Sequence, residues 1–123
     1  MHGVSYVVCV MPAAAKPIQS ITADLHALDQ LFIEHPELDL LLDDKSPTGD
    51  CKIKQKWLVS WYLDLYENIH YQHNKGVIAE ELWTGWEQEI KQTSNRPGFR
   101  EQYKALKRYY NEDFQKFIKR LFV

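Results

Sequence analysis

The chain has 123 residues, of which 45% are hydrophobic and 26% are charged, and its formal net charge is −2. This length suits one core of about four or five helices and excludes a second independent domain of ordinary size. The composition excludes intrinsically disordered and collagen-like chains, and the near-neutral charge excludes a surface that attracts nucleic acid or anionic membranes over its whole area.

Residues 1–17 are predicted to form an apolar arm ahead of a single helical domain over residues 18–123. The arm contains an apolar run from Val4 to Met11 that has no helical period and is far shorter than the roughly 20 residues of a membrane-spanning helix. We expect it to pack on the body of the protein or on a partner; the alternatives are a disordered start and contact with a membrane. The interface residues predicted in it are Val4, Tyr6, Val7, Val8 and Val10.

Past Pro17 the apolar residues recur every three or four positions from Ile18 to Phe32, which predicts an amphipathic helix over residues 18–34. The polar residues of this segment, Asp24 among them, fall on the opposite face. Since the residue before a proline is disfavoured in a helix, we expect Pro36 to end it.

Residues 36–42 begin with a proline and contain a leucine cluster, which predicts one or two further helical turns. Residues 43–50 contain turn-forming residues and no apolar side chain, as is typical of a surface loop. The strongest helical pattern follows. It begins at Ile53, continues to Ile69 and is expected to end near Gly76, where glycine can adopt the left-handed conformation of a helix end.

The remaining patterns predict a helix over residues 78–93 with Leu82 on its apolar face and another over residues 97–110 with Tyr103 on its apolar face. After a break at Asn111, a final helix is predicted to end near Leu121. No alternating pattern predicts a strand after the arm. We therefore predict an all-α, antiparallel bundle of about four or five helices with a short apolar N-terminal arm.

Four tryptophans lie on two successive predicted helices: Trp57, Trp61, Trp83 and Trp86. We expect them to form an aromatic core, because each indole buries a large apolar area. The alternative is that the indoles of an antiparallel helix pair enclose a flat apolar ligand pocket.

Short patterns at the ends of these helices are Leu31-Phe32-Ile33-Glu34-His35-Pro36-Glu37-Leu38, Leu82-Trp83-Thr84-Gly85-Trp86, and Ser94 followed by Pro97-Gly98-Phe99-Arg100 and Tyr109-Tyr110. Together they resemble a loose group of small prokaryotic helical domains of unknown function. The resemblance covers about residues 18–122. It implies an all-helical domain that often follows a membrane helix and contains no catalytic residues.

Glu67, His70 and His73 are the best candidates for metal ligands, because Glu-x-x-His is the spacing that di-metal bundles use. Such a site needs a second copy of the motif, which the sequence lacks, and the three side chains are too widely spread around a helix to converge. No nucleophile elbow, phosphate-binding glycine loop or four-cysteine zinc motif occurs. We expect no metal, no cofactor and no catalytic activity.

Basic residues are concentrated at the C-terminal end. From Lys91 onward nine basic and three acidic residues give a net charge of +6, whereas residues 1–90 carry −8. The residues Arg100, Lys104, Lys107 and Arg108 form a basic stripe that could contact phosphates or an anionic surface. The alternative is that the basic helices pack beside the acidic half of the chain or stay solvated.

These patterns predict a non-catalytic helical protein-interaction or accessory module that forms a homodimer. The alternative function is the binding of an anionic ligand, either nucleic acid or an anionic membrane surface, through the basic stripe. The two cysteines, Cys9 and Cys51, form no disulfide framework and favour a reducing compartment. We expect a cytoplasmic, bacterial protein, with peripheral membrane contact as the alternative location.

Overall fold

The computed structural model describes residues 19–123, and each regular element in this range is a helix, which confirms the all-α prediction. The elements are α2 (Gln19–Glu34), the 3₁₀-helix η1 (Pro36–Asp43), α3 (Asp50–Asn74), α4 (Glu80–Ser94), α5 (Pro97–Leu106), the 3₁₀-helix η2 (Lys107–Tyr109) and α6 (Glu112–Leu121). The arm predicted over residues 1–17, with its interface residues Val4, Tyr6, Val7, Val8 and Val10, lies outside the described residues.

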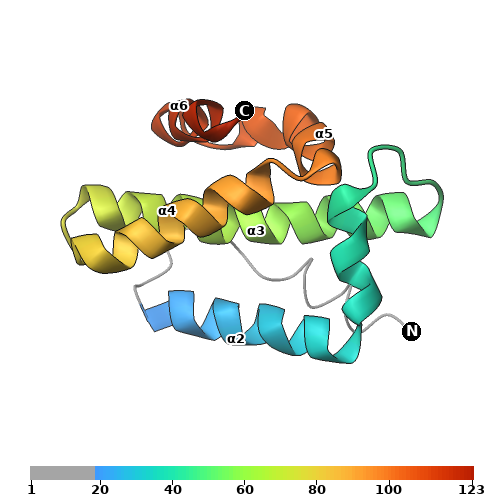
Figure 1. Cartoon of the computed structure of the whole chain (residues 1–123), viewed down its shortest axis with the longest axis horizontal. Coiled ribbons are helices and arrows are strands. Elements are labelled where there is room, and N and C mark those ends of the chain that lie inside the picture. Colours follow the sequence, from blue (N-terminus) through green and yellow to red (C-terminus); the bar gives the residue numbers. More distant parts are fainter. Residues whose placement is uncertain (1–18) are drawn as a thin grey trace.

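The long helix α3 is the centre of the fold (Figure 1). Helices α2 and α4 both lie antiparallel to α3, and η1 crosses it. Helices α5 and α6 form a layer above α3. The side chains at the middle of the core, Leu63, Tyr66 and Ile69, come from α3 and are almost completely buried. Each neighbouring helix adds apolar residues to this core, so α3 connects the packing of all the layers.

The first turns of α3 differ from the predicted pattern. Ile53, expected to begin the apolar face, is 55% exposed, while Gln55 is 1% exposed. The reason is that this end of α3 packs on the end of η1, where backbone carbonyls need donors. The Gln55 amide nitrogen Nε2 donates to the carbonyl oxygens of Leu41 and Asp44, at 2.7 Å each.

The buried face of α2 also differs from the expected one. Asp24, predicted on the polar face, is 4% exposed, and Leu25 is only half-buried. The helix packs through Ile21, Leu28 and Leu31, a row displaced from the predicted one, and Asp24 falls in that row. Periodicity predicted the helix and the burial of Ile21 and Leu28 correctly, but it placed Asp24 on the wrong face.

Two further predictions need correction. Leu82, expected on the apolar face of the helix over residues 78–93, is 63% exposed, because α4 faces the core through Trp83 and Ile90. The single helix predicted over residues 97–110 is divided, since α5 ends at Leu106 and η2 follows. The break at Asn111 is confirmed: its Oδ1 accepts a hydrogen bond from the Phe114 backbone nitrogen at 2.8 Å and caps α6.

The linker between α4 and α5 connects the layers. Arg96 reaches back to η1 and donates to Asp39 Oδ1 at 2.8 Å and to both carboxylate oxygens of Asp43 at 2.9 Å. The hydrogen bonds of Arg96 lower the pKa of the Asp43 carboxyl, as expected for a paired acid. Two residues further on, Gly98 is buried against the same end of η1.

Gly98 occupies a position with no room for a side chain. A Cβ atom there would overlap the carbonyl oxygen of Leu41 and lie 2.7 Å from both the Asp44 oxygen and the Gln55 Nε2 atom. The absence of a Cβ therefore lets α5 approach the hydrogen bonds that join η1 to α3. Gly85, in the exposed part of α4, has open space around its Cβ position.

These two glycines give a matched test. We expect Gly98→Ala to lower the free energy of unfolding by about 1–3 kcal/mol, because the packed backbone must move away from the added methyl group. Gly85→Ala should raise it by about 0.5–1 kcal/mol, because alanine favours a helix interior. Urea unfolding followed by circular dichroism measures both. Equal effects of the two substitutions would show that the contact at Gly98 does not constrain the fold.

Candidate functional site

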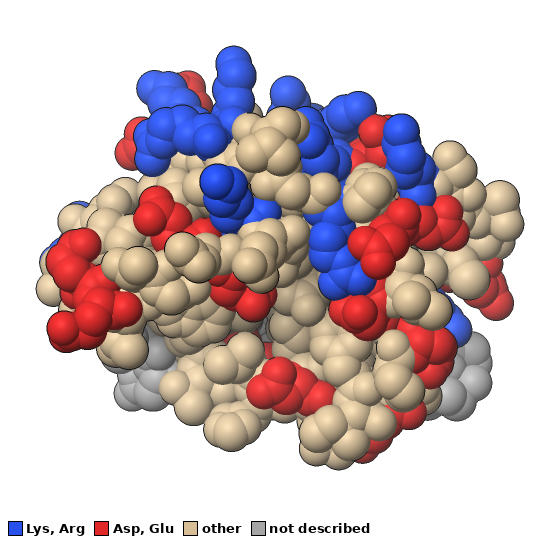
Figure 2. All heavy atoms as spheres, viewed as in Figure 1, with Lys and Arg blue, Asp and Glu red and all other residues tan. Residues whose placement is uncertain are grey.

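A cleft of about 490 Å³ lies between α5 and α6. Five cationic side chains and one carboxylate border it, together with two aromatic rings and an amide: Arg100, Tyr103, Lys104, Lys107, Glu112, Gln115, Lys116, Lys119 and Phe122. Seen from outside, Lys and Arg gather over the layer that holds α5 and α6, whereas Asp and Glu lie mainly over the rest of the molecule (Figure 2). We call this hollow the α5–α6 cleft.

The cationic groups of the cleft differ in their contacts. Arg100 Nη1 donates to the backbone oxygen of Val123 at 2.9 Å, and its guanidinium lies 4.5 Å from the centre of the Phe122 ring. Lys104 Nζ is 2.8 Å from Glu101 Oε2. In contrast, Lys107, Lys116 and Lys119 form no ion pair or hydrogen bond with the residues that the structure describes.

The N-terminal end of α6 is fixed to α3. Glu67 Oε2 accepts hydrogen bonds from the backbone nitrogen of Asn111 at 2.9 Å and from its side chain at 3.0 Å. Tyr110 donates its hydroxyl proton to Asp64 Oδ1 at 2.8 Å, and its backbone oxygen accepts from Gln115 Nε2 at 2.8 Å. Burial raises the pKa of Tyr110, and Asp64 raises it further, so its hydroxyl keeps the proton that it donates.

The C-terminal end of α6 is fixed to the end of α4. The Asn95 side-chain nitrogen donates to the carbonyl oxygen of Leu121 at 2.8 Å, and its side-chain oxygen accepts from the Val123 backbone nitrogen at 3.0 Å. Helix carbonyls at this end have no partner within their own helix, so Asn95 satisfies one of them. With both ends of α6 fixed, the two walls of the cleft keep their separation.

The cleft brings together three of the four residues of the predicted basic stripe, Arg100, Lys104 and Lys107. Arg108 does not border it, because the chain leaves α-helical geometry after Leu106; the Arg108 guanidinium lies 4.7 Å from the centre of the Tyr109 ring instead.

Sequence reasoning did not include Lys116 and Lys119 among the site residues. Their three-residue spacing on the polar face of α6 was the available signal. That signal could not show which side of α6 faces α5. The alternative prediction was that basic residues pair with the acidic half of the chain. Arg96 does so through Asp39 and Asp43, but Lys116 and Lys119 do not.

The structure separates Glu67, His70 and His73. Glu67 binds Asn111, and His73 Nε2 lies 3.0 Å from Glu80 Oε1 while its ring stacks on Trp83 with the ring centres 4.0 Å apart. His70 is buried, and its ring stacks on Phe117 at 4.5 Å. Within residues 19–123 no three His, Cys, Asp or Glu side chains are grouped in a way that could hold a metal ion.

A second hollow, of about 440 Å³, lies between α2 and α4 with α3 as its floor. Its lining is mainly apolar and includes Leu25, Phe32, Leu82 and Trp86, with Asp29 and Glu89 at its edges. The tryptophans do not enclose a flat pocket together. Trp61 and Trp83 are buried in the core, and of the other two only Trp86 borders this groove.

Comparison with family models, with curated proteins and with solved structures finds no match to this chain. The resemblance to small prokaryotic helical domains therefore stays a prediction. Among the helices of residues 19–123, none has the length and apolar character needed to cross a membrane.

The buried His70 generates a prediction about pH. Burial lowers its pKa, and the neighbouring His73 and Arg120 lower it further, while Asp113 acts in the opposite direction. As the pH falls below about 6.5, the ordinary value for histidine, the unfolded chain takes up a proton that folded His70 resists. The free energy of unfolding should therefore decrease from this pH downward until the lower pKa of the folded state is passed.

Urea unfolding at a series of pH values between neutral and mildly acidic measures this dependence. His70→Gln should make the profile flatter in this window, whereas His26→Gln, at an exposed position of α2, should leave it unchanged. If both variants keep the slope of the parent chain, His70 is not its source.

Proposed function

We propose that this protein is a non-catalytic binding domain that holds a phosphate-bearing anionic ligand in the α5–α6 cleft. The observation that carries the proposal is that five cationic side chains from α5, η2 and α6 border one hollow together with a single carboxylate. Three of these cations, Lys107, Lys116 and Lys119, have no anionic partner among the described residues. Their charge is available to a ligand.

The shape of the cleft favours a ligand that enters it over a flat surface that only touches its rim. A volume of about 490 Å³ lies within the roughly 300–1,000 Å³ range of small-ligand sites. Lys107 on one wall and Lys119 on the other would contact such a ligand from two sides. Contact from two sides orients a phosphate group better than a single row of charges.

The charge distribution also supports the proposal. Basic residues lie over one layer of the molecule and acidic residues mainly over the other parts (Figure 2). An approaching polyanion is attracted to the first region and repelled from the others, so encounters lead to the cleft. Such attraction weakens as salt screens the charges.

A labelled single-stranded oligonucleotide serves as the polyanionic probe. We expect saturable binding in fluorescence anisotropy that weakens as salt rises. The double variant Lys107→Gln/Lys119→Gln should bind about tenfold or more weakly, and its dependence of log affinity on log salt should be shallower by about 1.4, for two lost contacts to a single strand.

The matched control removes the same charge at another place. Lys52→Gln/Lys54→Gln changes two exposed lysines at the start of α3, far along the chain from the cleft, and should retain the affinity and the salt dependence of the parent. Equal losses in the two double variants would mean that general charge, and not the cleft, attracts the probe.

The α2–α4 groove supports a second candidate function, the predicted protein-interaction module that forms a homodimer. Leu82 projects from its edge and is 63% exposed, and half-buried Phe32 and Trp86 line it. Exposed apolar surface of this kind commonly marks an interface between chains. We propose a second copy of this chain as the partner.

Light scattering tests this second candidate. The full chain should have the mass of a dimer at micromolar concentrations, and Leu82→Glu should lower it to that of a monomer, because a carboxylate cannot be buried there without a partner. Leu40→Glu, at a 68% exposed position on η1, is the control and should stay dimeric. A monomeric full chain would exclude the homodimer.

A further inference from the structure

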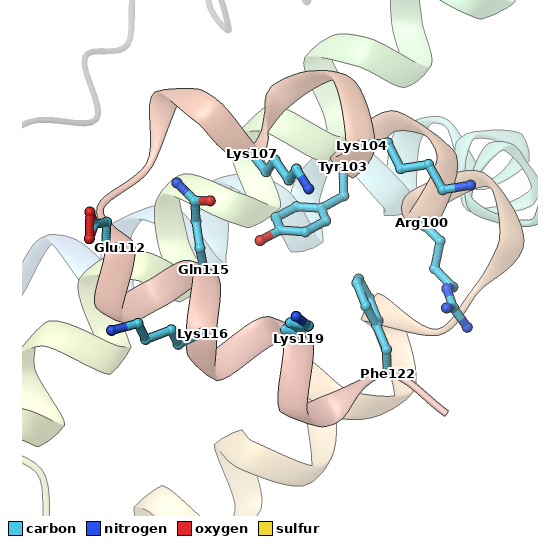
Figure 3. A pocket seen from close by; sticks show the side chains of 9 residues that line it. All are labelled: Arg100, Tyr103, Lys104, Lys107, Glu112, Gln115, Lys116, Lys119 and Phe122. Carbon is cyan, nitrogen blue, oxygen red and sulfur yellow. The ribbon is translucent and has the colours of Figure 1, made fainter.

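Tyr103 is the most buried polar group of the α5–α6 cleft. The residue is 4% exposed, and its ring packs against Phe122 with the ring centres 5.6 Å apart. Its hydroxyl makes no hydrogen bond with the residues that the structure describes. Figure 3 shows the ring lying across the cleft with this hydroxyl directed towards α6.

The hydroxyl oxygen itself is not among the enclosed unpaired polar atoms of the described residues, so it opens onto the cleft and is available to a ligand there. Among the other tyrosines that are buried or half-buried, Tyr66 donates to Glu89 at 2.6 Å and Tyr110 donates to Asp64, whereas the Tyr62 hydroxyl has no hydrogen-bond partner among the described residues. Burial raises the pKa of Tyr103, so its hydroxyl stays protonated and is a donor. It lacks only an acceptor inside the cleft.

Two lysines are placed to share that acceptor. Lys107 comes from η2 and Lys119 from α6, and they approach the hollow from its two walls (Figure 3). Neither pairs with an acidic side chain among residues 19–123. Lys104 and Lys116 point away from the hollow and are suited to outer contacts.

We propose that the Tyr103 hydroxyl and the ammonium groups of Lys107 and Lys119 form a binding site for the terminal phosphate of a phosphate monoester. This inference rests on the proposed function, because it names the anion that the α5–α6 cleft selects. The site supplies two positive charges and one neutral donor. A phosphate monoester supplies close to two negative charges near pH 7 and three free oxygens, so both the charge and the number of donors match.

A phosphate diester fits these groups less well. It carries one negative charge and has two free oxygens, so one ammonium group or the hydroxyl would remain without an acceptor. Lys107 and Lys119 are exposed, so a group left unpaired would stay hydrated, and the diester would make one fewer hydrogen bond to a charged group than the monoester. The site therefore prefers the end of a phosphorylated molecule to a phosphate within a chain.

Phe122 indicates the character of the group that carries the phosphate. Its ring borders the cleft beside Tyr103, and one side of it is covered by the Arg100 guanidinium. A ligand whose phosphate lies between the lysines would place its next atoms near this ring. An apolar or aromatic carrier would gain contact there.

Phenyl phosphate and its methyl ester, which is a diester of the same group, are the probes. Chemical-shift titration of the full chain at pH 7.5 should show the monoester binding about tenfold more tightly. Tyr103→Phe should remove most of this preference, because a hydrogen bond to a charged group contributes about tenfold or more to affinity and the retained ring keeps the packing against Phe122. Tyr109→Phe, at a 68% exposed position, is the matched control and should bind like the parent.

Equal affinities for the two probes, or equal losses of both in Tyr103→Phe, would overturn the monoester site. The oligonucleotide experiment is independent of this result, because a strand without a terminal phosphate offers only diesters. If oligonucleotide binding still depends on Lys107 and Lys119, the proposed function stands without the monoester site. If it does not, the proposed function fails.

Two sources could supply a monoester, a soluble molecule or a lipid headgroup. Vesicles of neutral lipid containing phosphatidate, a monoester, are compared with vesicles containing phosphatidylglycerol, a diester. Binding only to phosphatidate that is lost in Tyr103→Phe supports the site and assigns it to a lipid. Binding of phenyl phosphate without vesicle binding supports the site and assigns it to a soluble ligand. Vesicle binding that is equal for both lipids and insensitive to Tyr103→Phe would overturn it.

Discussion

The fold depends on the place where the end of η1, the start of α3 and the start of α5 meet. Gln55 donates to two carbonyl oxygens there, and Gly98 lies directly over these bonds because it has no side chain. Two residues earlier, Arg96 holds η1 through Asp39 and Asp43. These contacts determine how α5 crosses α3, and the position of α5 determines one wall of the α5–α6 cleft.

Local physical chemistry made most of the helices predictable. The stop before Pro36 and the cap at Asn111 follow from steric and hydrogen-bonding rules that act within a few residues, and the structure has both. The buried Gln55 and Asp24 were not predictable in this way. Their burial depends on segments distant in the chain, and a pattern within one helix contains no information about what lies opposite.

The candidate site also combines features that the sequence predicted with features that it did not predict. The basic stripe predicted from spacing contained three residues that border the cleft, Arg100, Lys104 and Lys107, but it also contained Arg108, which does not border it. The second wall of the cleft was not predictable in this way, because it depends on how α6 packs against the rest of the chain. That packing is fixed by Glu67 and Asn95 and not by the lysines themselves. Tyr103 was expected only as a member of the apolar face of its helix. Its unpartnered hydroxyl is visible only when both walls are present.

The residues that position α6 are distinct from the residues that would touch a ligand. Asn95, Asn111 and Glu67 make the structural hydrogen bonds, whereas the side chains of Lys107 and Lys119 make none with the described part of the chain. The two lysines can therefore be substituted during evolution with little loss of folding stability. A scaffold of this kind can be retained while its specificity diverges, so descendants of one ancestor could recognise different anions with the same helices.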